Sequence, residues 1–346
     1  MKSTIRFEKE VSEVRLLDPS KGFNESVQSI ERRRDSLLER WCRINVQRAS
    51  RPTDVTKDSS LAELAKSTEK GCLFCPENIE RTTPKFPPFL VPEGRIKVGG
   101  STVFPNLFPF ARLHAVVTLT EKHFVPLEEM EAEIIGDGLR ASLELAKVLN
   151  TKDPQSKYVS VNWNCLPTAA ASLMHPHFQV VADSRPTKYV AEAVSASESY
   201  LRRNGSSYWS DLIESEEGGE RFVAREGCFA WVASFAPMGN NEVVGIANGT
   251  SQLLGLHEGE VNDLAKGLSK ILKAYSRLGL QGLNMAVYSE PLAQETKRFS
   301  LHARLISRPK LKLLYTSDAG FMERLHDEVI VETMPEAVAA ELRAPY

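Results

Sequence analysis

Two histidines on either side of a proline carry the clearest chemistry in this sequence. His175-Pro176-His177 is followed by Phe178 and Gln179. In a strand, residues two apart point to the same face, so His175, His177 and Gln179 would act together, and Pro176 would fix their aim. A neutral imidazole can attack phosphorus and form a phosphoramidate when its neighbour is held in place. The alternative is a pair of structural histidines held by hydrogen bonds.

A Cys-x-x-Cys pair indicates a metal site. Cys72 and Cys75 supply two thiols with the spacing of half a tetrahedral zinc site. The chain has 5 cysteines, and an odd number favours thiols or metal ligands over a disulfide framework. Two packed thiols and a redox pair are the alternatives. Two of the 7 histidines would complete the site, and we favour His123 and His175, which stand at the ends of predicted strands.

These residues lie within a recurring order of predicted strands and helices. In the first half, strands at 114–120, 158–164 and 175–183 accompany an amphipathic helix at 127–149. The second half repeats this order, with strands at 228–235, 242–247, 282–290 and 299–309 and a helix at 256–278. We therefore predict an α+β protein that contains a duplicated module.

The repeat predicts where the histidine chemistry is confined. At an offset of 127 residues, His175 aligns with His302 and His177 aligns with Arg304. The second copy would then lack the second histidine of the pair. The predicted divisions are an N-terminal extension at 1–28, a catalytic module with the zinc site at 29–190, and a second module at 191–346.

Composition narrows the function classes. The 346 residues carry a formal net charge of −2, which argues against a general nucleic-acid binder but allows local binding of a small anion. No apolar run approaches the roughly 18 residues of a membrane span, and the N-terminus has no apolar signal segment. We therefore predict a cytoplasmic protein with no membrane partner.

Five segments, in order, resemble the galactose-1-phosphate uridylyltransferase family of the histidine-triad (HIT) superfamily. They are RRRDSLLERWCRINVQRASRP at 32–52, GCLFCPEN at 71–78, VFPNLFPF at 103–110, LTEKH at 119–123 and NWNCLPTAAASLMHPHFQ at 162–179. The resemblance implies two HIT-like modules, each an antiparallel sheet with a long helix packed across it. It also implies a homodimer.

The resemblance assigns roles to individual residues. It implies one structural zinc bound by Cys72, Cys75, His123 and His175, and no second metal, since only His302 remains of the motif for one. It implies His177 as the nucleophile, with Gln179 holding a phosphate oxygen. The remaining substrate-binding candidates are Asn164 and Ser172 for the phosphates, Asn106 for the ribose and base, Arg48 and Arg51 for phosphate charge, and Glu323, with His326 nearby, for a sugar.

The predicted reaction moves a nucleoside monophosphate from a nucleotide sugar to a hexose 1-phosphate through a nucleotidyl-histidine. Phosphate or water as acceptor would instead make the protein a phosphorylase or a hydrolase. A zinc-stabilised nucleotide-binding protein without catalysis is the alternative of another class. The chain departs from the family pattern at Phe178 and at 165–168, where the pattern has a lysine and a glycine.

Overall fold

A single large sheet organises the molecule, which is seen here in a computed structural model that describes residues 5–50, 60–312 and 317–344. The sheet has 10 strands, and neighbouring strands are antiparallel throughout. From one edge to the other they are β4 (Ile96–Val98), β5 (Ser101–Pro105), β6 (Leu113–Thr118), β8 (His177–Asp183), β7 (Tyr158–Cys165), β12 (Gly282–Tyr288), β13 (His302–Arg308), β11 (Val243–Ala247), β10 (Phe229–Ala233) and β9 (Phe222–Glu226).

The strand order reads the same from both edges, which confirms the predicted pair of α+β modules. Strands β4, β5, β6, β8 and β7 of the first module correspond to β9, β10, β11, β13 and β12 of the second. The two modules meet where β7 pairs with β12, for example Asn164 with Asn284. The duplicated unit is therefore half of one continuous sheet and not a separate sheet.

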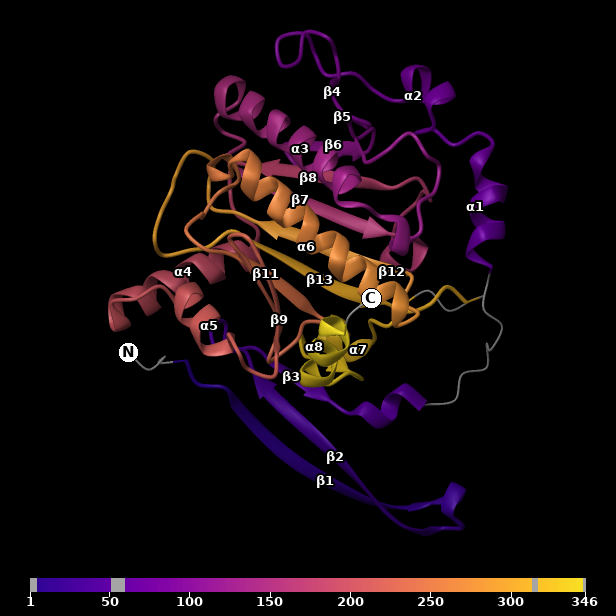
Figure 1. Cartoon of the computed structure of the whole chain (residues 1–346), viewed down its shortest axis with the longest axis vertical. Coiled ribbons are helices and arrows are strands. Elements are labelled where there is room, and N and C mark those ends of the chain that lie inside the picture. Colours follow the sequence, from indigo (N-terminus) through magenta and orange to yellow (C-terminus); the bar gives the residue numbers. More distant parts are fainter. Residues whose placement is uncertain (1–4, 51–59, 313–316, 345–346) are drawn as a thin grey trace.

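Two long helices cover one face of the sheet side by side (Figure 1). They are α3 (Ala132–Lys152) and α6 (Glu258–Arg277), close to the helices predicted at 127–149 and 256–278. Ten of the 21 residues of α3 and ten of the 20 residues of α6 are buried, and they lie on the face that packs on the sheet. Gly138 brings α3 close to the sheet, since a Cβ there would lie 2.3 Å from Leu119 and 3.1 Å from Phe178.

Different helices cover the opposite face in the two modules. In the first module, α1 (Leu61–Glu69) leads to α2 (Pro76–Thr82), where Ile79 joins an apolar cluster with Phe104 and Val116. In the second module, α4 (Lys188–Asn204) and α5 (Tyr208–Glu216) bury an aromatic cluster against β10 and β11. The sheet face is therefore covered more completely in the second module than in the first.

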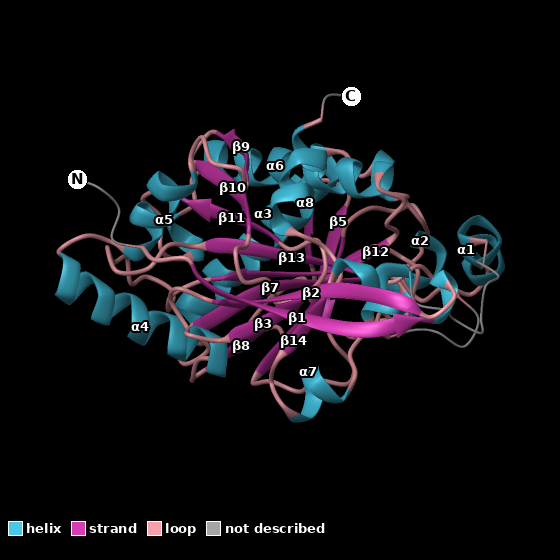
Figure 2. Cartoon of the chain, turned by 90° about the horizontal axis from the view of Figure 1, so that it is seen from below, coloured by secondary structure: helices cyan, strands magenta, loops and turns pink. Residues whose placement is uncertain are grey.

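A smaller sheet projects below the large one (Figures 1 and 2). Its order is β1 (Glu8–Asp18), β2 (Asn24–Arg34), β3 (Trp41–Ile44) and β14 (Val329–Val331), and β14 runs parallel to β3. The hairpin of β1 and β2 contains most of the predicted extension at 1–28, and residue 28 lies within β2. The divisions at 28 and 190 remain predictions; residue 190 lies within α4.

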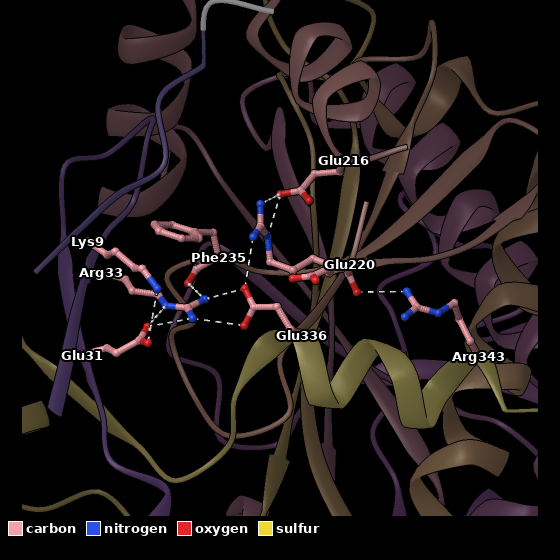
Figure 3. A network of polar contacts seen from close by, with 9 residues as sticks. Lys9, Glu31, Arg33, Glu216, Glu220, Phe235, Glu336 and Arg343 are labelled. Carbon is pink, nitrogen blue, oxygen red and sulfur yellow. Dashed lines mark hydrogen bonds and ion pairs between the residues drawn. The ribbon is translucent and has the colours of Figure 1, made fainter. Parts of the chain in front are cut away.

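A buried arginine attaches the small sheet to the large one (Figure 3). Arg33 of β2 is 2% exposed and makes two hydrogen bonds, of 2.9 and 3.1 Å, to Glu336 of α8 (Pro335–Arg343). Arg221, next to β9, bonds the same carboxylate at 3.1 Å, and both guanidinium groups lie over the Phe235 ring. The N-terminal hairpin, the C-terminal helix and the second module are thus joined through one carboxylate.

The remaining helix, α7 (Phe321–Leu325), lies at the periphery. In the described ranges, none of the helices is both long and apolar enough to cross a membrane.

The structure corrects the alignment of the two histidines. Leu119 donates its amide to the Pro176 carbonyl, and Ala247 donates in the same way to Leu301, which makes His302 the counterpart of His177. The side chains agree, because Nδ1 of His177 bonds the carbonyl of residue 175 at 2.8 Å and Nδ1 of His302 bonds that of residue 300 at 2.9 Å. The prediction that the second module lacks the second histidine is therefore wrong. It lacks the first, with Ser300 in the place of His175.

Candidate active site

Four buried side chains converge at one end of the first module, as predicted. Cys72 and Cys75 precede α2, His123 follows β6 and His175 precedes β8; their ligand atoms all lie within 4.8 Å of one another. The Cys75 sulfur is 3.6 Å from Nδ1 of His123 and 3.6 Å from Nδ1 of His175. Two sulfurs and two imidazole nitrogens at such separations can hold a tetrahedral metal ion such as zinc.

The surroundings of this cluster favour a bound cation. Nε2 of His175 lies 2.8 Å from the Thr120 carbonyl, and Nε2 of His123 lies 3.1 Å from the Thr68 hydroxyl. These contacts leave both Nδ1 atoms as lone-pair donors toward the thiols. Burial and the neighbouring Cys72 raise the pKa of Cys75 to about 12, and burial lowers the pKa of His175 to about 4. A bound divalent cation would stabilise the thiolate forms of Cys72 and Cys75, and so offset the burial that disfavours the Cys75 thiolate.

His177 is held as a neutral imidazole with one free nitrogen. Its Nδ1 donates to the His175 carbonyl at 2.8 Å, so the lone pair is on Nε2. Burial lowers the pKa of His177, which favours the neutral form. The ring of Phe74 contacts the imidazole edge to face at 5.3 Å. Within the described part of the chain, no hydrogen bond occupies Nε2.

Strand register places polar side chains in a line with His177. Thr118 pairs with His177, and Asn164 pairs with Asn284. The β7–β8 ladder runs to Trp163 opposite Phe178, so the next two residues, Asn164 and His177, are also neighbours across the strands. Paired residues share a face, with Cβ atoms about 4.5–5.5 Å apart. We call Thr118, His177, Asn164 and Asn284 the His177 row.

Gln179 lies one row further along the same face. Its Oε1 is 2.7 Å from Nε2 of His114. Asn106 lies beside them, with Nδ2 3.3 Å from the same nitrogen. Phe110, which packs on the His114 ring at 4.3 Å, is 75% exposed. The predicted base segment therefore meets the predicted phosphate-binding residue through His114, for which the sequence predicted no role at the site.

The departures from the family pattern fall on opposite sides of the sheet. Phe178 points into the core beneath α3, away from His177, and is fully buried against Trp163. The segment 165–168 instead leads from Cys165, which packs on the main core, to Thr168 on the site face, where the Thr168 carbonyl accepts from Arg308. There Leu166 has φ 73° and ψ 164°, and Ala170 has φ 66°, conformations that normally favour glycine.

Several predicted residues lie elsewhere. Ser172 is exposed on the loop before β8. Arg48 and Glu323 line a separate groove of about 750 Å³, together with Arg308 and Lys310, and none of the His177 row is among its lining residues. The Glu323 carboxylate is also used locally, since it accepts from the amides of Gly320 and Ile330. Arg51 lies outside the described residues.

The chain is 30% identical to an uncharacterized protein of Archaeoglobus fulgidus over 341 residues, which cover 98% of each chain. The two proteins belong to one family. No family model matches the chain.

Solved structures identify the fold. An ADP-glucose phosphorylase of Arabidopsis thaliana with bound ADP-glucose is similar at a TM-score of 0.72 and 21% identity, covering 92% of this chain and 99% of that one. A galt-like protein of the same plant has a TM-score of 0.70 at 21% identity, with 92% and 100% covered. A uridylyltransferase has a TM-score of 0.67 at 21% identity, with 90% and 97% covered. The galactose-1-phosphate uridylyltransferase-like fold, predicted from the sequence, is confirmed.

Proposed function

We propose that this protein is a nucleotidyltransferase that works through a covalent nucleotidyl-histidine. The observation that carries the proposal is the free Nε2 of His177, whose tautomer is set by the 2.8 Å bond from Nδ1 to the His175 carbonyl. A nucleophile needs a lone pair aimed at the reacting atom, and this hydrogen bond also stabilises the positive charge that the ring gains.

The reaction has two steps. Nε2 of His177 attacks the α-phosphorus of a nucleotide sugar, and the bond from phosphorus to the oxygen of the sugar 1-phosphate breaks. An oxygen of a hexose 1-phosphate then attacks the same phosphorus, and the bond to Nε2 breaks. Asn164 and Gln179 flank His177 on the sheet face and would donate hydrogen bonds to the non-bridging oxygens.

Zinc has a supporting role in this proposal. Cys72, Cys75, His123 and His175 would hold it, and it would fix the segment that enters β8. Because the carbonyl of His175 orients His177, a rigid His175 keeps the nucleophile in place.

Inorganic phosphate is a second candidate acceptor. The similar fold of the ADP-glucose phosphorylase supports it, at a TM-score of 0.72. The changed segment 165–168 supports it too, since this segment borders the His177 row and lacks the lysine of the uridylyltransferase pattern.

The test uses UDP-glucose and ADP-glucose labelled in the α-phosphate. We expect label on the protein that is stable in base, is lost in acid and is absent from His177→Ala. Release of the label by galactose 1-phosphate or by phosphate then identifies the acceptor. Tight nucleotide binding without any adduct would favour the non-catalytic binding protein and would contradict the proposal.

We also propose a homodimer in which the groove lined by Arg48 and Glu323 completes the His177 site of the other copy. Four cations and three carboxylates line this groove. Arg308 pairs with Asp318 at 2.8 Å, and Arg48, Lys310 and Lys312 would contact the phosphate of a sugar phosphate. Mixing His177→Ala with Arg48→Ala protein should restore part of the activity, because one shared site would then be intact. Absence of restoration in a mixed dimer would show that each copy works alone.

A further inference from the structure

Asn284, a residue of the second module, reaches into the His177 row of the first. Its side-chain Nδ2 lies 3.0 Å from the Ala169 carbonyl oxygen and 2.8 Å from Oδ1 of Asn164. It is half-buried in β12, at the line where the two modules meet.

These two contacts fix the orientation of both amides. A backbone carbonyl can only accept, so the Asn284 atom that faces Ala169 must be the NH₂ group. The same NH₂ group then requires an acceptor from Asn164, which therefore presents its oxygen. The Asn164 Nδ2 is turned away from Asn284, and within the described ranges it makes no hydrogen bond. It remains available as a donor beside His177.

The second module also holds the loop that borders this row. Ala169 belongs to that loop, and so does Thr168, whose carbonyl accepts a 3.1 Å bond from Nε of Arg308. Gly282 permits the close approach, because a Cβ there would lie 2.7 Å from Oγ1 of Thr168. Leu166 and Ala170 both have positive φ. Residues other than glycine keep this strained backbone conformation only where the surrounding structure stabilises it.

We propose that Asn284 is a positioning residue for nucleotidyl transfer. It turns the Asn164 amide so that its NH₂ group faces the phosphate, and it holds the 166–170 loop through Ala169. The inference rests on the proposed function, because it assigns Asn164 as the phosphate donor. It also explains how the second module serves a reaction whose nucleophile lies in the first.

The decisive variant is Asn284→Asp, which preserves size and removes the donor. A carboxylate in that place attracts the NH₂ group of Asn164, so Asn164 would rotate and point its oxygen at the phosphate. Loss of one preorganised donor to developing charge slows a reaction by about 100- to 1,000-fold. We expect that loss in the single-turnover rate of adduct formation and in kcat, with a smaller change in KM.

Two further measurements separate positioning from a structural defect. In an Asn164→Ala background, Asn284→Asp should cause little further loss, since its effect on rate passes through Asn164. Hydrogen exchange of the loop amides, whose bonds include Ala169 to Leu166 and Ala170 to Pro167, should be faster in Asn284→Asp. Asn204→Asp is the matched control, because Nδ2 of Asn204 also donates to a carbonyl, that of Tyr200, but in α4.

The outcomes are distinguishable. If wild-type protein forms no adduct, the proposed function fails. If wild-type protein forms the adduct and Asn284→Asp forms it at an unchanged rate, or if the losses of the two single variants multiply in the double variant, this inference alone is overturned. Should Asn284→Asp fold poorly, as judged by thermal unfolding, Asn284→Leu replaces it. Leucine has a similar shape and offers no donor, so the Asn164 amide would lose its fixed orientation, and adduct formation should still be slower than in wild-type protein.

Discussion

His177 and His302 occupy equivalent places in the two modules, and their surroundings are opposite in character. His177 has Thr118 and Asn164 as neighbours across the strands, whereas His302 has Ile246 and Tyr288. Gln179 has its counterpart in Arg304, two residues after the histidine in each strand.

Both histidines donate Nδ1 to a carbonyl two residues earlier, so this bond does not distinguish them. The difference is at Nε2. Tyr189 Oη lies 3.0 Å from Nε2 of His302 and accepts from Arg304, so its proton goes to the imidazole and occupies the lone pair. The Trp209 ring stacks on the His302 ring, with the two ring centroids 4.3 Å apart.

The segments that precede each module determine this outcome. In the first, the segment around α2 brings two thiols to His175 and leaves Nε2 of His177 free. In the second, α4 and α5 bring Tyr189 and Trp209 onto the sheet, and His302 is fully buried. The same strand geometry thus supports a candidate nucleophile in one place and a core residue in the other.

The largest effect should come from removing the metal. Cys75→Ser should abolish zinc binding at the proposed site and destabilise the first module by up to about 10 kcal/mol, because structural zinc sites contribute folding free energy of that order. Metal analysis and denaturant unfolding measure this, with Cys228→Ser as the control cysteine. Unchanged zinc content would contradict the assignment of the cluster.

Trp209→Ala should be the most damaging change on the other side of the comparison. Removing a buried tryptophan costs about 4 kcal/mol in unfolding free energy, and His302 would lose its stacked neighbour. Adduct formation at His177 should persist in the folded fraction. Loss of the adduct in protein that is still folded would show that the two histidine sites are coupled.

Removing one partner of the buried ion pair between Arg304 and Glu242 should lower the free energy of unfolding by about 3 kcal/mol. Burial raises the pKa of Glu242, and the charge of Arg304 opposes that rise. Arg304→Met leaves the carboxylate without its cation, whereas the double variant Arg304→Met/Glu242→Met removes both charges. Urea unfolding should therefore show the double variant to be more stable than Arg304→Met. If the double variant were less stable than Arg304→Met, buried Glu242 would not depend on the charge of Arg304 for its stability in the fold.

The smallest effect is a pH dependence. Burial, followed by the charge of Arg304, lowers the pKa of His302 to about 3. The unfolded chain takes up this proton near pH 6.5, so His302 reduces stability as the pH falls below that value, by up to about 1.4 kcal/mol per pH unit. His302→Gln should show a shallower loss of unfolding free energy between about pH 7 and about pH 5. The exposed His326→Gln is the control, and equal slopes in all three proteins would exclude this contribution.

The sequence predicted the repeated elements well, because alternation and helical spacing mark the strands and helices of both modules directly. It also predicted the four residues of the metal cluster. It did not predict the register, since loops between equivalent strands differ in length and shift the offset from 128 residues at Leu119 to 125 at Pro176. That shift caused the misplacement of His302.

Other features leave no signal in one sequence. Residues 8–18 mix charged residues with valine and leucine without a period of two, so the sequence does not distinguish β1 from a polar extension. His114 and Asn284 are single polar residues in strands, and only the pairing of strands shows that they touch Gln179 and Asn164. The contacts that position a site are therefore harder to predict than the residues that carry its chemistry.

The parallel pairing of β14 with β3 has a consequence for how the chain folds. Val329 pairs with Cys42, so the two strands are separated by most of the polypeptide. Pairings of such long range form slowly, because a large loop must close before any contact is gained. During synthesis β3 cannot pair with β14 until almost the whole chain has left the ribosome. We therefore expect completion of the small sheet to be a late step in folding, after the two modules have joined.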